Sequence, residues 1–542
     1  MPEQTAIPTA IQLPENEAKH WADFIAERII QEKGDKDLYT LASGITPSGT
    51  IHIGKFREII TTELVSRALI RMGKKVRFIY SWDDYDTFRK VPSDMPKQEM
   101  LKGMLYQPIV DIPDVYGTES SYARHNEVTL ETVAPKLGIS NVEFIYQSQM
   151  YRSGKYNDLI IQAMDYRDKI CEILQTSKTQ EIEDDWVPIA TYCSKCNRDR
   201  VSFSNYGTDV KTIDSECKLC GNKETLNLRE STNLKLPWRI DWPMRWAFEG
   251  VDFEPGGADH SAAGGSFDTS KIIVRNIFGA TPPVYAKYAF ITPKGERKKM
   301  GSSVGNGLSV DEVLNIYEPE IVRWFFASYK PDAPFNMALD IDVLKNYENF
   351  DRMERIVYGQ EDADPGKRAA LKRIYEMSQI NSDGKIPVDM PIQLSFRHLT
   401  VQLQINEFDI ANTRPYYALQ IKNERDERRY QERAKRAAYW IENYAPDEFK
   451  FILNKSKRED IQMTNTQRTF IADLKQLLET QWGAFADERD LQNKISEKMV
   501  THGLESTDTY VLLYQLLVNR DKGPRLGNFI LSIGKEKILG LL

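Results

Sequence analysis

The segment from Thr46 to Lys55 carries residues suited to binding a nucleotide phosphate. It reads Thr-Pro-Ser-Gly-Thr-Ile-His-Ile-Gly-Lys and stands between an expected strand and an expected helix. The first turn of a helix offers unpaired backbone N–H groups and the positive end of the helix dipole, and both favour an anion. His52 can donate to a phosphate oxygen, and Gly54 lets a flat adenine ring approach the backbone. Taken alone, His52 could equally be an ordinary histidine at a helix start.

A second segment, Glu296 to Asn306, combines basic side chains, hydroxyls and glycines (Glu-Arg-Lys-Lys-Met-Gly-Ser-Ser-Val-Gly-Asn). Such a loop can clamp a pyrophosphate that leaves an α-phosphate, because phosphoryl chemistry depends mostly on positioning and on cancelling charge. Alone it could be a solvated turn. Together the two segments predict one nucleotide site, closed by parts of the chain about 250 residues apart. Neither GxxxxGK[ST] nor GxGxxG occurs in the sequence, so the common nucleotide-binding loops are excluded.

Four of the five cysteines form two pairs, Cys193-x2-Cys196 and Cys217-x2-Cys220, separated by twenty residues. This spacing predicts a tetrahedral structural zinc site with four thiolate ligands. The alternative is a set of surface thiols without metal. Cys171 lies outside the pattern and is expected to be a lone packing residue.

Acidic and aromatic residues suggest the charge of the substrate. A desolvated ammonium needs a carboxylate and favours aromatic faces, and the chain offers both in Asp83, Asp84, Asp86, Trp82, Trp238, Trp242 and Trp246. A substrate with a carboxylate side chain would need arginine instead, and Arg239 and Arg245 flank the tryptophans. An amino group is therefore the preferred ligand, while a solvated turn and a core helix remain the structural alternatives for these two clusters.

The elements that must position these residues form a βαβ unit. We expect strands at Leu38–Ile45 and Val76–Trp82, joined by a helix from His52 to Met72 whose apolar residues recur three or four apart. Such a unit predicts a parallel sheet covered by helices, with ligands outside the carboxyl ends of the strands. The pattern continues with a helix at Glu127–Leu137 and a strand at Val142–Gln149. After about Phe350 the sequence indicates long, charged helices.

Length and composition indicate a globular protein of several domains. The chain has 542 residues, of which 41% are hydrophobic and 28% charged, and its net charge is −7. This charge argues against indiscriminate coating of nucleic acid but allows a local basic face. The sequence contains neither an apolar run of the ~18–20 residues that span a bilayer nor a secretory signal, so we expect a cytoplasmic protein without a membrane partner.

The motifs resemble those of class I aminoacyl-tRNA synthetases. His52-Ile53-Gly54-Lys55 is similar to their "HIGH" element, and Lys299-Met300-Gly301-Ser302-Ser303 to their "KMSKS" loop. Within this class the chain resembles the class I lysyl-tRNA synthetases, on the evidence of Ser43–Gly49, Trp82–Asp86, Trp238–Trp246 and Phe253–His260. The likeness runs from about Leu41 to Phe326 and returns at Lys522–Phe529.

This resemblance implies an α/β Rossmann-like parallel-sheet catalytic domain with a zinc-bearing insertion, followed by an all-helical anticodon-binding region. The expected boundaries are residues 1–150 and 241–350 for the two catalytic halves, 151–240 for the insertion and 351–542 for the helical region. The implied activity is ATP-dependent attachment of L-lysine to tRNA through an aminoacyl-adenylate, with ATP, Mg²⁺ and a structural Zn²⁺.

The resemblance also assigns residues. His52 and Lys299 are the expected catalytic pair. The expected ATP-binding residues are Pro47, Ser48, Gly49, His52, Gly54, Gly257, Asp259, Lys299, Met300, Ser302 and Ser303. Lysine is expected to bind at Gly44, Thr46, Asp83, Asp84, Trp242 and His260, and zinc at Cys193, Cys196, Cys217 and Cys220.

Two departures from the family pattern keep alternatives open. Ser302 stands where the loop has its second lysine, and Val304 where a lysine often follows. A weakened relative that binds tRNA or an adenylate is one alternative, and a class I synthetase for another amino acid, such as glutamate, is the other. In the helical region, Lys422–Arg436 and Lys522–Arg525 are candidates for RNA contact, although interleaved acidic residues could make Lys422–Arg436 a salt-bridged helix face.

Overall fold

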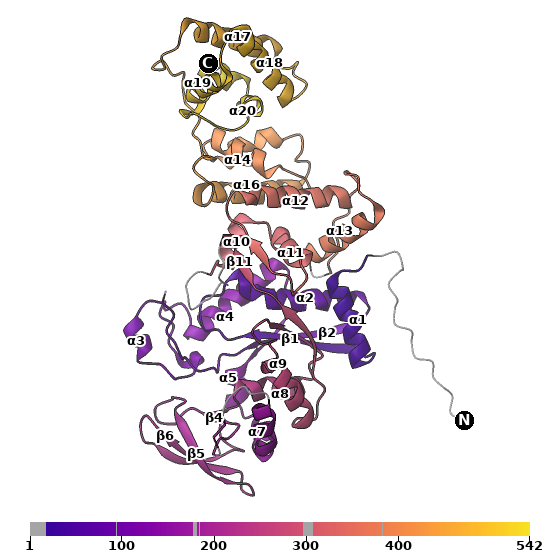
Figure 1. Cartoon of the computed structure of the whole chain (residues 1–542), viewed down its shortest axis with the longest axis vertical. Helices are drawn as coiled ribbons and strands as arrows, with labels where there is room; N and C mark the ends of the chain where they lie inside the picture. The colour runs from indigo at the N-terminus through magenta and orange to yellow at the C-terminus, as the bar shows by residue number, and fades with distance from the viewer. Residues whose placement is uncertain (1–17, 94, 177–181, 184, 296–306, 382) are drawn as a thin grey trace, which may run out of the picture. The chain divides into compact units, whose positions relative to one another are not determined.

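The computed structural model describes residues 18–93, 95–176, 182–183, 185–295, 307–381 and 383–542. The described residues divide into two compact units (Figure 1). The first comprises Met1–Leu314, Pro319–Met337 and Gly359–Ile386, and the second comprises Asn315–Glu318, Ala338–Tyr358 and Pro387–Leu542. Among the helices of the described residues, none is both long and apolar enough to cross a bilayer.

The first unit is built on a five-stranded sheet in which every pairing is parallel, in the order β10-β9-β1-β2-β3. The strands are β1 (Leu38–Ile45), β2 (Lys75–Trp82), β3 (Glu143–Tyr146), β9 (Phe253–Gly257) and β10 (Val284–Tyr288). The expected βαβ unit is confirmed, since α2 (Phe56–Arg71) joins β1 to β2 after a 3-10 turn at Ile53–Lys55. Residues Phe56–Leu69 are all buried, so α2 is covered on every side.

The bounds of α4 and β3 differ from the sequence expectation, and a hydrogen bond explains each difference. The helix α4 (Tyr122–Val133) begins five residues earlier than the predicted Glu127, because the Ser121 side chain caps it by accepting from the Arg124 N–H. The predicted strand Val142–Gln149 stops at Tyr146, and α5 (Gln147–Arg152) follows. The N–H of Ser148 donates to the Asp84 carboxylate at 2.7 Å, which stabilises a helix start where the pattern continued a strand.

The remaining elements of the first unit surround this sheet and form the insertion. The insertion contains a three-stranded antiparallel sheet of β5 (Val201–Gly207), β6 (Thr212–Cys217) and β7 (Lys223–Asn227), and the pair β4 (Ala190–Thr191) and β8 (Leu234–Lys235). A separate parallel pair joins β11 (Ile291–Pro293) to β12 (Phe335–Met337). The other helices are α1 (Trp21–Lys33), α3 (Gln98–Lys102), α6 (Asn157–Asp165), α7 (Arg167–Thr176), α8 (Trp238–Glu249), α9 (Ser266–Asn276), α10 (Val310–Ile316, which continues into the second unit), α11 (Pro319–Ser328) and α13 (Pro365–Ser378).

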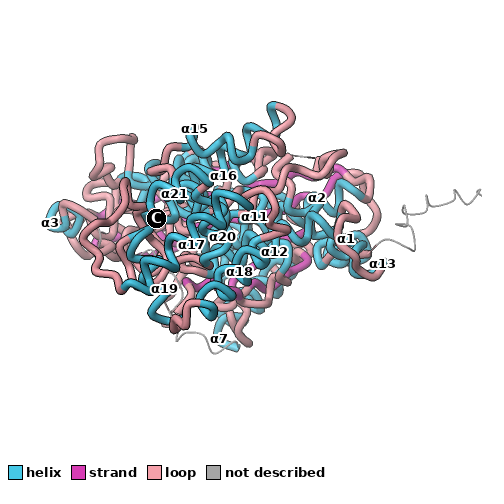
Figure 2. Tube along the Cα trace, turned by 90° about the horizontal axis from the view of Figure 1, so that it is seen from above, coloured by secondary structure: helices cyan, strands magenta, loops and turns pink. Residues whose placement is uncertain are grey.

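The second unit is helical in its described residues, as the sequence predicts. Figure 2 draws each of its labelled elements in the helix colour. Its helices are α12 (Asp342–Val357), α14 (Phe396–Ile405), α15 (Ile410–Thr413), α16 (Glu424–Asn443), α17 (Asn465–Gln481), α18 (Glu488–Thr501), α19 (Ser506–Val518), α20 (Leu526–Ile533) and α21 (Lys535–Leu541). Its apolar core includes Phe470, Leu474, Leu513, Leu517 and Phe529.

The basic helix α16 directs several of its arginines inward. Arg433 is fully buried and donates to both carboxylate oxygens of Asp351, at 2.9 and 3.0 Å, and to Glu318 at 2.5 Å. Arg429 binds Glu354 at 3.0 Å. Buried charges of this kind persist only when they are paired. The structure therefore favours the salt-bridged alternative for these arginines, while Lys422, Arg425, Arg428 and Lys435 are exposed.

Candidate active site

The carboxyl end of β1 places Gly44 and Thr46 at the edge of the sheet. The Gly44 N–H donates to Glu58 Oε1 at 2.9 Å, and Thr46 Oγ1 donates to Asp86 Oδ2 at 2.9 Å. A Cβ atom at position 44 would lie 2.4 Å from the Ser81 carbonyl oxygen of the neighbouring strand. Glycine is therefore required at position 44 for β1 and β2 to pair.

His52 lies in a buried position beside the chain that follows the basic loop. Its side chain is 6% exposed, it pairs with Ser309 in an isolated antiparallel bridge, and the Ile53 N–H donates to the Leu308 carbonyl at 2.9 Å. A Cβ at Gly307 would lie 2.9 Å from the His52 side chain. Within the described part of the chain, His52 Nδ1 is buried without a hydrogen-bond partner. This nitrogen is thus left for a ligand or a water molecule.

Burial keeps the His52 imidazole neutral. Removal from water, reinforced by the nearby Lys55, lowers its pKa from 6.5 to about 4. The unfolded chain therefore binds a proton at His52 at a higher pH than the folded chain does. The contribution of His52 to stability is fully present above pH 6.5 and is lost as the pH falls towards 4.

We expect the free energy of unfolding to fall more steeply between pH 6.5 and 4 in the wild type than in His52→Gln. A shift of this size corresponds to on the order of 3 kcal/mol. Urea unfolding at several pH values measures the difference. Parallel pH curves for the two proteins would show that His52 is protonated as easily in the fold as in the unfolded chain.

Lys299, Met300, Ser302 and Ser303 lie outside the described residues. The described chain resumes at Gly307, against the His52 side chain. The segment that follows the loop is therefore in contact with the His52 motif, as the two-segment site requires.

The three aspartates after β2 have different partners. Asp83 Oδ1 accepts from Arg245 Nη1 at 2.7 Å, and burial raises the pKa of Asp83 to about 7. Both oxygens of Asp84 accept from Ser148, one from the backbone N–H and one from the hydroxyl, and burial raises its pKa to about 6. Lys235 Nζ donates to Asp86 at 2.8 Å. This cluster is a packed ionic network rather than the solvated turn that was its alternative.

The tryptophans of α8 stand four residues apart on one helix face. The rings of Trp238 and Trp242 stack at a centroid distance of 5.1 Å, and Trp242 lies 4.7 Å from Trp246. The His260 ring is 5.8 Å from both Trp238 and Trp242. The structure thus brings together Trp242 and His260, two of the expected lysine-binding residues, in one aromatic group.

The end of β9 supplies the residues expected at the adenosine. Gly257 is buried at the last position of the strand, and Asp259 is exposed in the turn that follows. A Cβ at position 257 would lie 2.6 Å from Asp259 Oδ1. β9 is the parallel neighbour of β1. Gly257 and Asp259 therefore follow β9 at the same edge of the sheet at which Gly44 lies.

Two residues of the site were not singled out by the sequence analysis. Glu58, on α2, accepts from the Gly44 N–H and from the Tyr288 hydroxyl, the latter at 2.6 Å. Burial raises the pKa of Glu58 to about 8. The Tyr288 hydroxyl would lie 3.5 Å from a Cβ on Gly257. Glu58 therefore connects the two halves of the site, and its position four residues after Gly54 was the signal available in the sequence.

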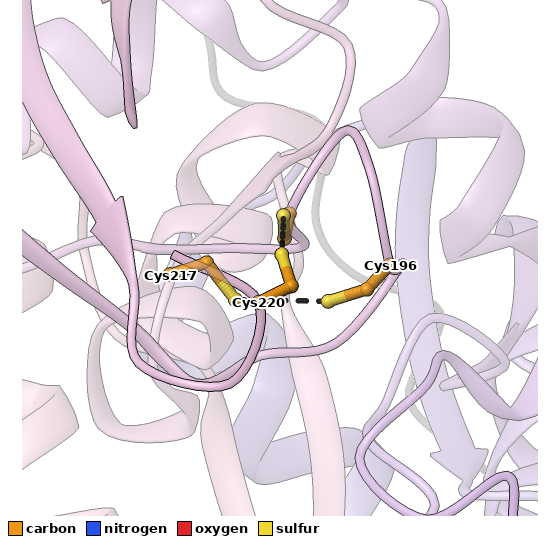
Figure 3. Close-up of side chains that lie close together, drawn as sticks. Cys196, Cys217 and Cys220 are labelled. Atoms are coloured by element: carbon orange, nitrogen blue, oxygen red, sulfur yellow. Dashed lines mark hydrogen bonds between the residues drawn. The ribbon is translucent and has the colours of Figure 1, made fainter. Parts of the chain in front are cut away.

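The four paired cysteines come together in the insertion (Figure 3). Their sulfur atoms all lie within 4.8 Å of one another, with Cys193 Sγ 3.6 Å from Cys220 Sγ and Cys196 Sγ 3.6 Å from Cys217 Sγ. Tetrahedral Zn–S bonds of about 2.3 Å place sulfurs at about this separation. The cysteine turns end at the left-handed residues Asn197 and Gly221. The donor set and its geometry fit Zn²⁺.

A parallel sheet whose carboxyl edge carries the His52 motif defines the class of protein. The sequence model described as "tRNA synthetases class I (K)" matches residues 19–381, so the chain has the architecture of a class I tRNA synthetase. The chain is 45% identical to the lysine–tRNA ligase of Borrelia garinii subsp. bavariensis, with 96% of this chain and 98% of that protein covered. Lysine–tRNA ligases of Treponema pallidum and Thermococcus kodakarensis are each 38% identical over the same shares. The chain belongs to the class I lysyl-tRNA synthetase family.

Proposed function

We propose that this chain is an ATP-dependent lysine–tRNA ligase. The observation that carries the proposal is the 45% identity to a lysine–tRNA ligase over almost the full length of both chains. The fold supports it, because Gly44 and Gly257 lie at the carboxyl ends of the neighbouring parallel strands β1 and β9.

In the first step, a carboxylate oxygen of lysine attacks the α-phosphorus of ATP. A bond forms between these atoms, the bond from the α-phosphorus to the bridging oxygen breaks, and pyrophosphate leaves. His52, as a neutral imidazole, donates to the phosphates. Lys299 neutralises the charge of the leaving pyrophosphate, and Met300, Ser302 and Ser303 assist in binding it. Mg²⁺ would accompany both ATP and the pyrophosphate.

The remaining ATP contacts come from backbone and small side chains. Pro47, Ser48 and Gly49 form the turn before the helix start, Gly54 lies under the adenine, and Gly257 with Asp259 holds the ribose. Glycines at these positions allow the backbone to approach the nucleotide closely.

In the second step, the 2′-hydroxyl oxygen of the terminal adenosine of tRNA attacks the acyl carbon of the adenylate. The ester bond forms, the acyl–phosphate bond breaks, and AMP leaves with the hydroxyl proton on its phosphate. We assign the cognate tRNA as a lysine tRNA, in keeping with the relatives' names.

The substrate lysine is held by Gly44, Thr46, Asp83, Asp84, Trp242 and His260. The described contacts favour Asp83 over Asp84 as the acidic partner, because both oxygens of Asp84 already accept from Ser148. Trp242 and His260 supply aromatic faces for the ammonium and the alkyl chain.

The insertion is proposed to hold a structural Zn²⁺ at Cys193, Cys196, Cys217 and Cys220. Four thiolates close the coordination sphere, so the metal supplies stability rather than catalysis. Its expected effect is to keep the small antiparallel sheet of β5, β6 and β7 folded.

ATP–pyrophosphate exchange with a panel of amino acids tests the proposal. We expect exchange that depends on lysine, with glutamate and arginine near the background rate. Exchange supported by another amino acid would assign a different synthetase activity. Absence of exchange with every amino acid would indicate a binding protein weakened by Ser302 and Val304.

A further inference from the structure

Arg245, on α8, joins the acidic and the aromatic parts of the candidate site. Its Nη1 donates to Asp83 Oδ1 at 2.7 Å, and its guanidinium carbon lies 5.3 Å from the centre of the Trp238 ring. The side chain of Arg245 is 9% exposed. A buried guanidinium that binds a carboxylate and covers an aromatic face is held by both contacts. Arg245 therefore fixes Asp83 and Trp238 relative to each other.

Asp241 shares the charge of Arg245 with Asp83. Arg245 Nη2 lies 2.9 Å from Asp241 Oδ2, one helix turn earlier. The other oxygen of Asp241 accepts from the Tyr151 hydroxyl, which in turn accepts from the Leu236 N–H at 3.2 Å. Asp241 is thus anchored by α5 and by the chain after β8, and Arg245 is held between two fixed carboxylates.

The buried charges around Arg245 do not balance. Lys235 neutralises Asp86 at 2.8 Å, whereas Asp83 and Asp241 have one cation between them among the described residues. Buried ions persist when they are paired, so these two carboxylates can accept one more positive charge. A substrate ammonium would supply it, and Arg245 holds Asp83 in place without cancelling the charge of both acids.

We propose that Arg245 is a positioning residue for lysine, and that Asp241 determines how strongly Arg245 acts on Asp83. Arg245 orients the Asp83 carboxylate that receives the ammonium, and it holds the Trp238 ring, on which Trp242 stacks at 5.1 Å. It acts through these side chains rather than by contact with the substrate. This inference rests on the proposed function and adds two residues to those that set the affinity for lysine.

The ionisation of Asp83 gives this arrangement a measurable signature. Burial raises the pKa of Asp83 to about 7, Arg245 opposes the rise, and Asp86 and Asp241 add to it. Asp83 is therefore partly protonated in the empty site near neutral pH, and lysine should bind better as the pH rises through about 7. Other titratable groups around Asp83 and Arg245 are Glu58, Tyr80, Tyr151, Tyr156, Lys235 and Glu254.

The test follows kcat/KM for lysine in pyrophosphate exchange on the full chain from about pH 5.5 to 8.5, because this ratio reports ionisation in the free enzyme. We expect a wild-type midpoint near pH 7. In Arg245→Gln, loss of the opposite charge should raise the midpoint by about one unit or more and raise the KM for lysine at neutral pH about tenfold. In Asp241→Asn, loss of the like charge should lower the midpoint instead. The ionisation of ATP is common to these proteins and cancels in the comparison.

Arg239→Gln is the matched control on the same helix. Arg239 donates to the Thr269 hydroxyl at 3.3 Å rather than to an acid, so its loss should leave the midpoint at the wild-type value. The KM for ATP should stay unchanged in all the variants.

Opposite displacements of the midpoint cannot come from a general loss of stability, and Asp241→Asn keeps the test decisive if Arg245→Gln does not fold. A midpoint in Asp241→Asn that rises or stays in place, or one in folded Arg245→Gln that does not rise, would overturn the inference. A rise in the KM for ATP as large as that for lysine would show a general structural role and would overturn it too. In these cases lysine-dependent exchange by the wild type leaves the proposed function intact. Wild-type protein without such exchange would refute the proposed function, and this inference with it.

Discussion

Lys299→Ala is expected to lower lysine-dependent pyrophosphate exchange by about 10²–10³-fold. The typical loss on removing one preorganised contact to a developing charge has this size. Two features lead us to propose Lys299 as the main cation of this loop. Ser302 stands at the position of the second lysine, and the neutral imidazole of His52 supplies a donor but no positive charge. We therefore expect neutralisation of the charge that develops on the pyrophosphate to depend on Lys299.

The matched control is Lys298→Ala, which removes a neighbouring cation from the same loop. We expect it to keep most of the exchange rate, and we expect the far-ultraviolet circular dichroism of both variants to match that of the wild type. A Lys299→Ala protein that exchanges at the wild-type rate would remove this residue from the catalytic set. An equal loss of exchange rate in both variants would assign the neutralisation of the pyrophosphate to the basic loop as a whole.

Removal of the proposed Zn²⁺ is the second change with a large expected effect. We expect the purified chain to contain about one zinc per molecule and a strong chelator to unfold the insertion. Apparent binding free energies of structural zinc in small domains are about 10–16 kcal/mol at neutral pH. The sheet of β5, β6 and β7 buries few aliphatic side chains, namely Ile213 and Leu226, so the proposed metal is expected to dominate the stability of this sheet.

Elemental analysis gives the stoichiometry, and limited proteolysis between residues 190 and 236 reports unfolding of the insertion. Cys217→Ser should lose the metal and become sensitive to protease, whereas Cys171→Ser should retain both the metal and resistance, because Cys171 lies outside the cluster. A metal-free chain whose insertion resists proteolysis would show that the four thiols are not a folding site.

Sequence patterns with a short range were reliable guides to the fold. The strand at Leu38–Ile45 is found with the predicted bounds, and the two cysteine pairs converge. One exception arose where a side chain distant in the sequence decided a helix start. Asp84, 64 residues before Ser148, binds its N–H and begins a helix where the local pattern indicated a strand.

The candidate site shows the same division between features set by neighbouring residues and features set by residues distant in the sequence. The breaker-rich turn, the helix start and the candidate residues follow from residue type and spacing, and these are properties of a few neighbouring residues. The pairing of these groups with one another does not follow from residue type and spacing. Glu58 binds both Gly44 and Tyr288, which are 244 residues apart in the sequence.

The sequence by itself determined the class of chemistry, the cysteine ligand set and the alternation of strands and helices, because each depends on local spacing. Only the tertiary structure decided which charges are neutralised. Asp83 meets Arg245, Asp86 meets Lys235 and Arg433 meets Asp351. The energy of a charge depends on its partner and on its distance from water, and both are set by packing between remote segments.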